Sequence, residues 1–245
     1  MYINRVGQYN LSQFSKPKVL ALGPTLFLDA NTITGNDNDQ ITTWYDDSGN
    51  DYDFTAIGAL KPRLKKAANG INNNNVLKFN GAAMNSAVNL SSFISTSADT
   101  FFMVFKLISV DTDEEYMYNN DCAIGDLNGM WGVYFDTNGY VYTYYYSSGV
   151  QYAYNTISTS TAYTLRSRHA SSNIYQCINN GSENSDGAGN VITSNPVTIG
   201  RSSGEGPTYS YANIDIAEII IFNTNLSTAN KAIVDGYLRK KYLTY

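Results

Sequence analysis

Short apolar runs, separated by clusters of polar and turn-forming residues, recur along most of the chain. This pattern is typical of β-strands joined by turns, and the spacing of the runs predicts a sandwich or barrel. The expected strands are Leu26–Ala30, Ile41–Tyr45, Val76–Phe79, Phe101–Ile108, Trp131–Phe135, Tyr140–Tyr146, Ala162–His169, Asn173–Ile178, Val197–Gly200 and Ile214–Phe222. The run Phe101–Ile108 is almost entirely apolar, so both of its faces should be covered.

The pattern becomes helical only near the end of the chain. One apolar stripe recurs there at helical spacing: Ile233, Val234, Tyr237, Leu238 and Tyr242. Ser227 is a suitable N-cap, and the basic run 239–241 suits the negative end of the helix dipole. We therefore expect one C-terminal helix that packs its stripe on the sandwich.

Composition narrows the choice of partners. The chain has 245 residues, 43% hydrophobic and 15% charged, with a formal net charge of −5. A negative protein of this kind is a poor ligand for nucleic acid or for an anionic membrane surface, and no stretch is apolar enough to span a bilayer. Tyrosine is favoured in strands and at interfaces, so the 21 tyrosines suit an all-β protein with a binding surface. Cys122 and Cys177 fit no zinc or CxxC spacing, and we expect free thiols.

Several motifs, in a fixed order, carry a family resemblance. The opening motifs are Leu26–Ala30, Trp44–Asn50, Lys61–Leu64 and Leu77–Gly81, and the closing ones are Ile216–Phe222, Leu226–Ser227, Gly236–Leu238 and Lys241–Leu243. Together they resemble the LamG-like domains of the concanavalin A-like lectin and glucanase superfamily, over residues 25–245. The resemblance implies an all-β, two-sheet antiparallel jelly-roll sandwich with one C-terminal helix. Members of the superfamily recur in adhesins, phage appendages and carbohydrate-binding modules.

These motif residues are expected to be structural. Trp44 should fill the core, and the run Asp47–Asn50 should form a turn in which side chains bond the local backbone. Glu218, in an apolar strand, should accept hydrogen bonds from nearby backbone donors.

The sequence does not favour catalysis. Glycoside hydrolases of this superfamily carry paired glutamates and an aspartate at alternating strand positions. The carboxylates Asp111, Asp113 and Glu115 alternate here, but the order of residue types departs from that pattern. His169 is the only histidine and is expected at the surface. We therefore predict a protein that is not an enzyme, with a glycoside hydrolase or lyase as the weaker alternative.

Two loops are rich in the oxygen ligands that calcium prefers. Asp37 and Asp39 lie in one loop, and Asp46 and Asp47 lie in the next. Ca²⁺ takes six to eight oxygen ligands, and these four carboxylates are candidates for that set. A calcium site is therefore one expectation for the two loops. The alternative is that both loops are ordinary Asn- and Asp-rich turns.

The tyrosines form the strongest functional signal. Alternate residues of a strand share one face, which groups Tyr140, Tyr142, Tyr144 and Tyr146. Tyr152 and Tyr154 can lie beside them on a partner strand. Such a row could be a platform for sugar rings, a protein interface, or internal sheet packing.

Residues 1–24 are polar and irregular, and they predict an extended N-terminal arm before the sandwich domain of residues 25–245. The arm is either a poorly ordered terminus or an attachment segment. The first 20 residues lack the apolar core of a secretion signal, so we expect synthesis in a host cytoplasm without export by that route, and the virion as the final location.

A lectin-like fold in that setting predicts a virion appendage, such as a phage head fibre, decoration protein or tail-associated subunit. Its partners would be other virion proteins, bound through residues 1–24, and a host-surface glycan, and it would work as an oligomer or assembly subunit. The alternative is a free carbohydrate-binding module or a cell-surface adhesin.

Overall fold

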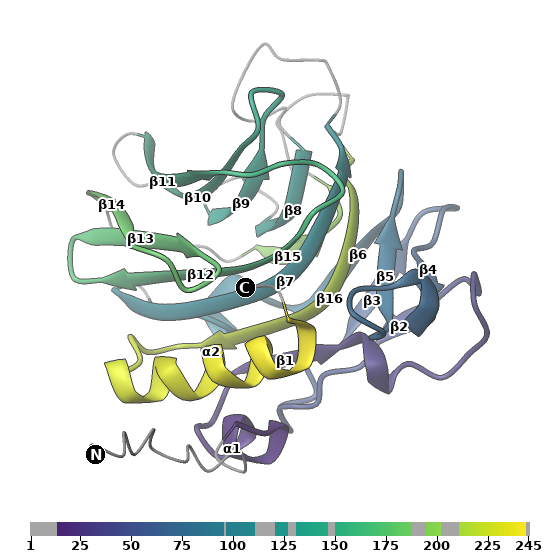
Figure 1. The fold of residues 1–245 in the computed structure, drawn as a ribbon, viewed down its shortest axis with the longest axis horizontal. Helices are drawn as coiled ribbons and strands as arrows, with labels where there is room; N and C mark the ends of the chain where they lie inside the picture. Colours follow the sequence, from purple (N-terminus) through teal and green to yellow (C-terminus); the bar gives the residue numbers. More distant parts are fainter. Residues whose placement is uncertain are drawn as a thin grey trace, which may run out of the picture.

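Two antiparallel sheets face each other, and a helix covers the outside of one of them (Figure 1). The computed structural model describes residues 14–95, 97–110, 121–126, 131–146, 150–187, 195–201 and 211–243. The predicted β-sandwich with a C-terminal helix is confirmed in this part of the chain.

The first sheet has the strand order β14-β13-β12-β7-β16-β5-β4, and β1 also pairs with β16. Its strands are β1 (Leu26–Asp29), β4 (Arg63–Lys65), β5 (Val76–Phe79), β7 (Ala98–Ser109), β12 (Ala162–Ala170), β13 (Asn173–Ile178), β14 (Asn184–Gly187) and β16 (Asn213–Phe222).

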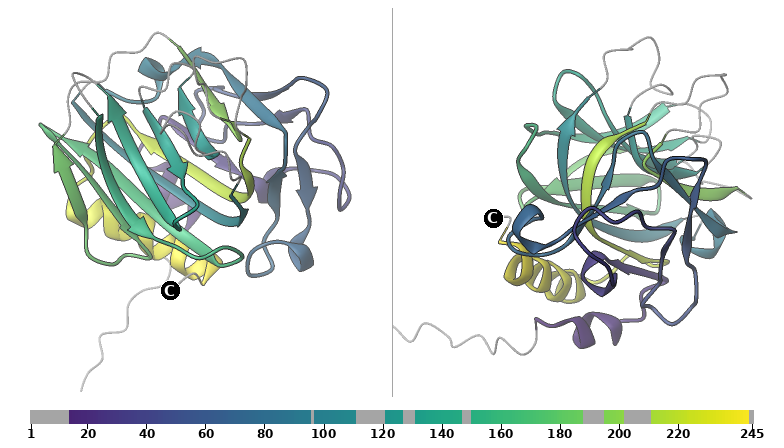
Figure 2. Two further views of the ribbon diagram at one scale, coloured as in Figure 1. Left: turned by 90° about the horizontal axis from the view of Figure 1, so that it is seen from above. Right: turned by 90° about the vertical axis from the view of Figure 1, so that its right-hand side faces the viewer.

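The second sheet has the strand order β11-β10-β9-β8-β15-β6-β3-β2. Its strands are β2 (Thr43–Trp44), β3 (Phe54–Ile57), β6 (Ala83–Asn89), β8 (Asp121–Asp126), β9 (Trp131–Phe135), β10 (Tyr140–Tyr146), β11 (Val150–Thr156) and β15 (Pro196–Ile199). Seen from above, the strands of residues 131–156 lie side by side in front of the yellow helix (Figure 2).

Alternation along β7 explains why the sandwich has a third layer. Phe101, Met103 and Phe105 point into the core between the sheets. Phe102 and Val104 point the other way, into a second apolar cluster beneath the C-terminal helix. The expectation that this strand is covered on both faces is therefore confirmed, and Trp44 is fully buried in the core as expected.

Helix α2 (Thr228–Tyr242) forms this outer layer. Ser227 caps it by accepting a hydrogen bond from the backbone N–H of Asn230, as the sequence predicts. Val234, Leu238 and Tyr242 are buried against the first sheet. No helix within the described residues is long and apolar enough to cross a membrane.

The described part of the expected arm differs from an extended segment. Helix α1 (Lys16–Leu20) buries Val19 completely in the cluster beneath α2. Lys16 also bonds Asp29 and Asp47, at 3.2 and 2.9 Å. A helix of five residues is too short to show apolar periodicity, which is why this helix is absent from the sequence-based prediction. Residues 1–13 of the expected arm lie outside the described residues.

Candidate functional site

The hairpin of β10 and β11 gathers the tyrosines that the sequence singles out. Tyr142 lies opposite Tyr154, and Tyr144 lies opposite Tyr152. The turn before β10 joins it to its other neighbour, β9, and the Asp136 carboxylate holds this turn by accepting the backbone N–H of Tyr140 at 2.8 Å. Gly139 adopts a φ of 81°, which a residue with a side chain rarely takes. Residues 136–139 thus form the turn of the hairpin between β9 and β10.

Four of these side chains form one surface, which we call the tyrosine face: Tyr140, Tyr142, Tyr152 and Tyr154. Tyr154 is 45% exposed, and the other three are half-buried. Tyr140 meets Tyr154 edge to face, with ring centroids 5.2 Å apart. Tyr142 meets Tyr152 in the same way at 5.4 Å. Edge-to-face pairs are a preferred aromatic geometry, so the rings hold each other in fixed orientations.

One predicted member, Tyr144, does not belong to this face. Tyr144 is only 4% exposed and packs edge to face on Tyr134, beside Cys122. Room for this packing comes from Gly132, where a Cβ atom would come within 2.7 Å of the Tyr134 ring. Tyr144 is therefore a packing residue, which corrects its assignment as a ligand contact. The side chain of Tyr146, at the end of β10, lies outside the described part of the chain.

Two carboxylates border the tyrosine face, one at each edge. The Tyr142 hydroxyl donates to the Asp136 carboxylate at 2.8 Å. Burial, and then this hydrogen bond, raise the pKa of Tyr142, so its hydroxyl remains protonated. On the other edge, the backbone N–H of Tyr152 donates to Asp186 at 3.3 Å. Neither carboxylate is among the site residues expected from the sequence: Asp136 lies in a turn, and β14, which carries Asp186, has no apolar alternation.

The inward side of β10 carries a different set of groups. Tyr145 is fully buried, and its hydroxyl lies 2.8 and 2.9 Å from the two carboxylate oxygens of Asp99. Burial raises the pKa of Asp99 to about 7. His169 is also fully buried, with Nδ1 3.9 Å from Asp99, and burial lowers its pKa.

The prediction that His169 is a surface residue is therefore wrong. It fails because His169 points inward from β12, where polar residues also line the core. Tyrosine, aspartate and histidine side chains could support catalysis, but all three are enclosed between the sheets with no exposed area. The cluster is thus a structural one in this conformation.

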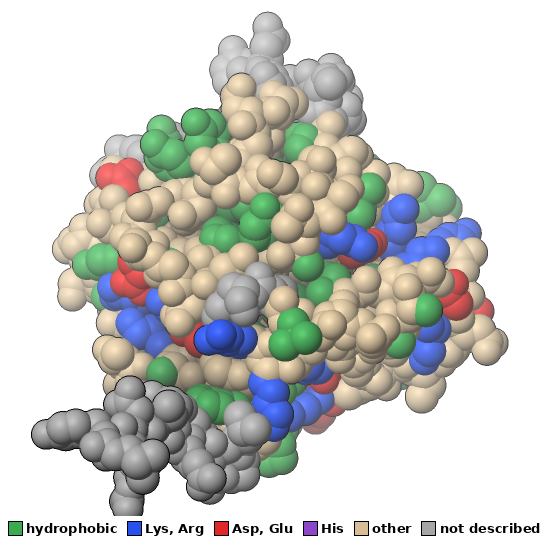
Figure 3. Space-filling model, in the orientation of Figure 1, with side chains coloured by type: hydrophobic (Ala, Val, Ile, Leu, Met, Phe, Trp, Pro, Cys, Tyr) green, Lys and Arg blue, Asp and Glu red, His purple; other side chains and the backbone are tan. Residues whose placement is uncertain are grey.

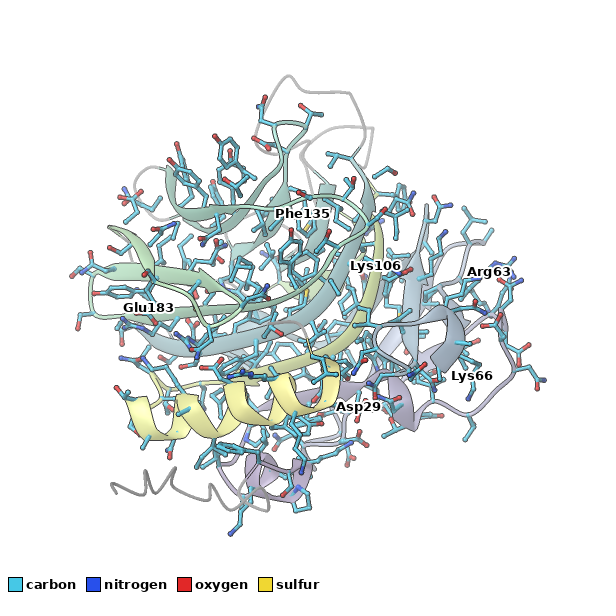
Figure 4. All side chains as sticks on the ribbon, in the orientation of Figure 1. Asp29, Arg63, Lys66, Lys106, Phe135 and Glu183 are labelled. Carbon is cyan, nitrogen blue, oxygen red and sulfur yellow. The ribbon has the colours of Figure 1, made fainter. Side chains whose placement is uncertain are left out.

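A groove of about 790 Å³ runs along α2 and offers a second possible site. The residues that line it include Phe14, Arg166, Glu183, Lys231 and Asp235. Its buried charges are paired with one another: Arg166 contacts both Asp235 and Glu183, and Lys231 lies 3.9 Å from Glu183. Figure 4 shows Glu183 beside the first turns of α2. These ion pairs tie the helix to the first sheet, so the groove has a clear structural role.

The four aspartates proposed for calcium do not converge. Asp37 bonds the backbone N–H of Lys66 and the side chain of Asn69. Asp39 accepts the N–H of Asn36. Within the described residues, no three His, Cys, Asp or Glu side chains are placed to hold a metal ion.

The second pair, Asp46 and Asp47, stabilises the turn of the Trp44–Asn50 motif instead. The Asp46 carboxylate accepts backbone N–H groups of Phe27, Ser48 and Tyr52. Asp47 pairs with Lys16 at 2.9 Å. The expected turn role of this motif is confirmed, and the assignment of these residues to one calcium site is corrected, because nitrogen donors already occupy their oxygens.

Glu218 is a further correction. It is fully buried, but it bonds side chains of α2 rather than backbone donors. Lys241 lies 2.7 Å and the Tyr242 hydroxyl 2.6 Å from its carboxylate. Lys241 also bonds Asp29 at 2.8 Å, near the C-terminal end of α2 (Figure 4).

The remaining candidate residues are the two cysteines and the alternating carboxylates. Cys122 and Cys177 are buried and form no disulfide, as expected. Burial raises the pKa of Cys177 to about 11, which leaves it an unreactive thiol. The alternating carboxylates Asp111, Asp113 and Glu115 lie outside the described residues.

The two-sheet antiparallel arrangement places this chain among the β-sandwich folds. No family model matches the sequence, and no curated protein matches it. The fold is therefore defined by solved structures, all of them at low identity.

Three of these structures illustrate the likeness. The binding domain of Paraclostridial Mosquitocidal Protein 1 has a TM-score of 0.64 and 9% identity, over 90% of this chain and 53% of that one. Botulinum neurotoxin type C, whose cell entry depends on two ganglioside molecules, has a TM-score of 0.62 and 12% identity, over 91% and 53%. Trypanosoma rangeli sialidase in complex with sialic acid has a TM-score of 0.55 and 13% identity, over 90% and 33%. This chain spans about half of the toxin chains and a third of the sialidase.

Proposed function

We propose that this protein is a non-catalytic glycan-binding domain and that the tyrosine face is its binding surface. The observation that carries the proposal is the group of four partly exposed tyrosines on one hairpin, with rings fixed edge to face. Two of the named neighbours, a ganglioside-dependent toxin and a sialidase in complex with sialic acid, support glycans as the class of ligand.

The chemistry of the face suits a sugar. The C–H groups on one side of a pyranose ring pack on an aromatic ring, and the hydroxyls at its edge need hydrogen-bond partners. Tyr154 offers its ring, while Asp136 and the exposed Asn138 provide polar groups at the rim. Asn184 holds the hairpin against the first sheet by donating to the carbonyl of Tyr154 at 2.8 Å. A surface fixed in this way binds without the cost of ordering mobile side chains.

Substitution of two rings tests this proposal. Tyr142→Ala with Tyr154→Ala should weaken binding to a glycan array by roughly tenfold or more, since each aromatic contact is worth about 0.5–1.5 kcal/mol beyond area burial. Tyr45→Ala is the matched control, because Tyr45 is 65% exposed and follows β2, at the opposite edge of the second sheet. Both proteins should melt close to wild type.

Two results would contradict the proposal. If wild type binds no glycan but captures a defined protein through the same rings, the face is a protein interface. If the double variant binds glycans as wild type does, the sugar site lies elsewhere.

The setting we propose is the surface of a virus particle, with residues 1–24 bound to other virion proteins. This part rests on the sequence alone. Mass spectrometry of purified particles tests it, because a virion subunit must be present in stoichiometric amounts. Its absence from the particles would leave a free carbohydrate-binding module or adhesin as the setting.

A further inference from the structure

Charge is distributed very unevenly along the chain. Residues 107–165 contain no Lys, Arg or His and seven Asp or Glu, which is a formal charge of −7. The remaining residues hold all 16 Lys and Arg with 14 Asp and Glu, which is +2. Strands β8 to β11, and with them the whole tyrosine face, come from the segment without a positive charge.

The structure keeps the cations of neighbouring segments away from this surface. Arg166 and Arg168, the next cations along the chain, leave β12 on the side of α2, where they pair with Asp235 and Glu183. In Figure 3, Lys and Arg gather around α2 and on the right of the molecule, and none is visible over β9 to β11. Strands β8 to β11 therefore bring no Lys or Arg of their own to the tyrosine face.

Negative charge, by contrast, touches the face directly. Asp136 bonds the Tyr142 hydroxyl at one edge, and Asp186 bonds the backbone of Tyr152 at the other. Asp186 is exposed. A ligand lying across the rings meets a carboxylate at either end.

From this geometry we propose that the tyrosine face selects uncharged glycans and rejects those that carry acidic groups. The inference rests on the proposed function and adds its ligand class. Neutral hydroxyls can donate hydrogen bonds to Asp136 and Asp186, which act as acceptors. A ligand carboxylate or sulfate offers these residues no donor and is repelled by them.

The repulsion sets the size of the expected effect. Two like charges 4 Å apart in water repel by about 1 kcal/mol, which corresponds to roughly fivefold in affinity. Salt screens exposed charges, so the discrimination should shrink as ionic strength rises.

Matched glycans provide the test. Galactose-terminated oligosaccharides and the same oligosaccharides capped with sialic acid are presented to the full chain at low and at physiological ionic strength. The capped glycans should bind at least about fivefold more weakly at low ionic strength. The double variant Asp136→Asn with Asp186→Asn should reduce the ratio of uncapped to capped binding, and this ratio is the readout because loss of the two acceptors affects both members of each pair. Asp51→Asn, an exposed aspartate near Tyr45, is the control and should leave the difference unchanged.

The outcomes separate the two proposals. Equal or tighter binding of the capped glycans overturns the selectivity and leaves glycan binding intact. A difference that persists in the double variant also overturns it, because the two carboxylates are then not its cause. If neither member of any pair binds, the proposed function fails, and the selectivity fails with it.

Discussion

The two outer faces of the sandwich are built on opposite principles. Beneath α2, ionised side chains are buried and paired, as where Glu218 meets Lys241 and Arg166 meets Asp235. On the tyrosine face, the half-buried groups are uncharged rings, and the carboxylates stand at its edges. Paired buried charges fix one arrangement of the elements that carry them, whereas exposed rings keep their faces available. The comparison indicates that the helix side holds the fold together and that the tyrosine side is available for binding.

The largest loss of stability is expected when one of the paired charges beneath α2 is removed. Lys241→Ala removes the cation that contacts both Glu218 and Asp29. Glu218 is fully buried, so an unpaired carboxylate there should cost about 3–5 kcal/mol in the free energy of unfolding. Chemical denaturation measures the loss, and Lys240→Ala, one exposed position earlier, should change it by less than about 0.5 kcal/mol. Similar losses in both variants would mean that the network does not stabilise α2.

The buried cluster between the faces should make stability depend on pH. Burial raises the pKa of Asp99 from 3.8 to about 7, so the folded protein keeps a proton that the unfolded chain has released. Stability from this group therefore falls as pH rises from about 4 to 7, by at most about 4 kcal/mol.

Asp99→Asn isolates this contribution. The unfolding free energy of wild type minus that of the variant should decrease across the same pH window, although His169, with its lowered pKa, acts in the opposite direction in both proteins. Asp186→Asn, at an exposed site, should follow wild type. Parallel profiles for wild type and Asp99→Asn would show that Asp99 titrates normally.

A smaller loss of stability is expected from a substitution on the inward side of β10. Tyr145→Phe keeps the ring but removes the hydroxyl that bonds both Asp99 oxygens. Leaving a buried acceptor without its donor should cost about 1–3 kcal/mol, measured by denaturant unfolding at neutral pH. An unchanged unfolding midpoint would indicate that Asp99 finds another donor.

The smallest change in stability is expected from a substitution on the tyrosine face. Tyr154→Phe, on a ring that is 45% exposed, should change stability by less than about 0.5 kcal/mol in the same assay. Its ring stays available for stacking, so glycan binding should also change little. A loss as large as that of Tyr145→Phe would show that both sides of the hairpin are equally structural.

The sequence alone determined the fold class and much of the hairpin that forms the candidate site. Period-two alternation placed β9, β10 and β13 at their observed bounds, because each strand has one face in the core. It did not predict β6, β8 or β14. The exposed half of β6, the glycine of β8 and the polar run of β14 carry no clear alternation.

Only the tertiary structure decided which tyrosines are exposed. Tyr142 and Tyr144 share one face of one strand, yet Tyr144 is buried because Tyr134 on β9 leans over the space at Gly132. The same holds for His169 and Glu218, whose partners lie 70 and 23 residues away along the chain. Local pattern fixes the direction of a side chain from its strand, but burial and charge pairing depend on segments that only folding brings together.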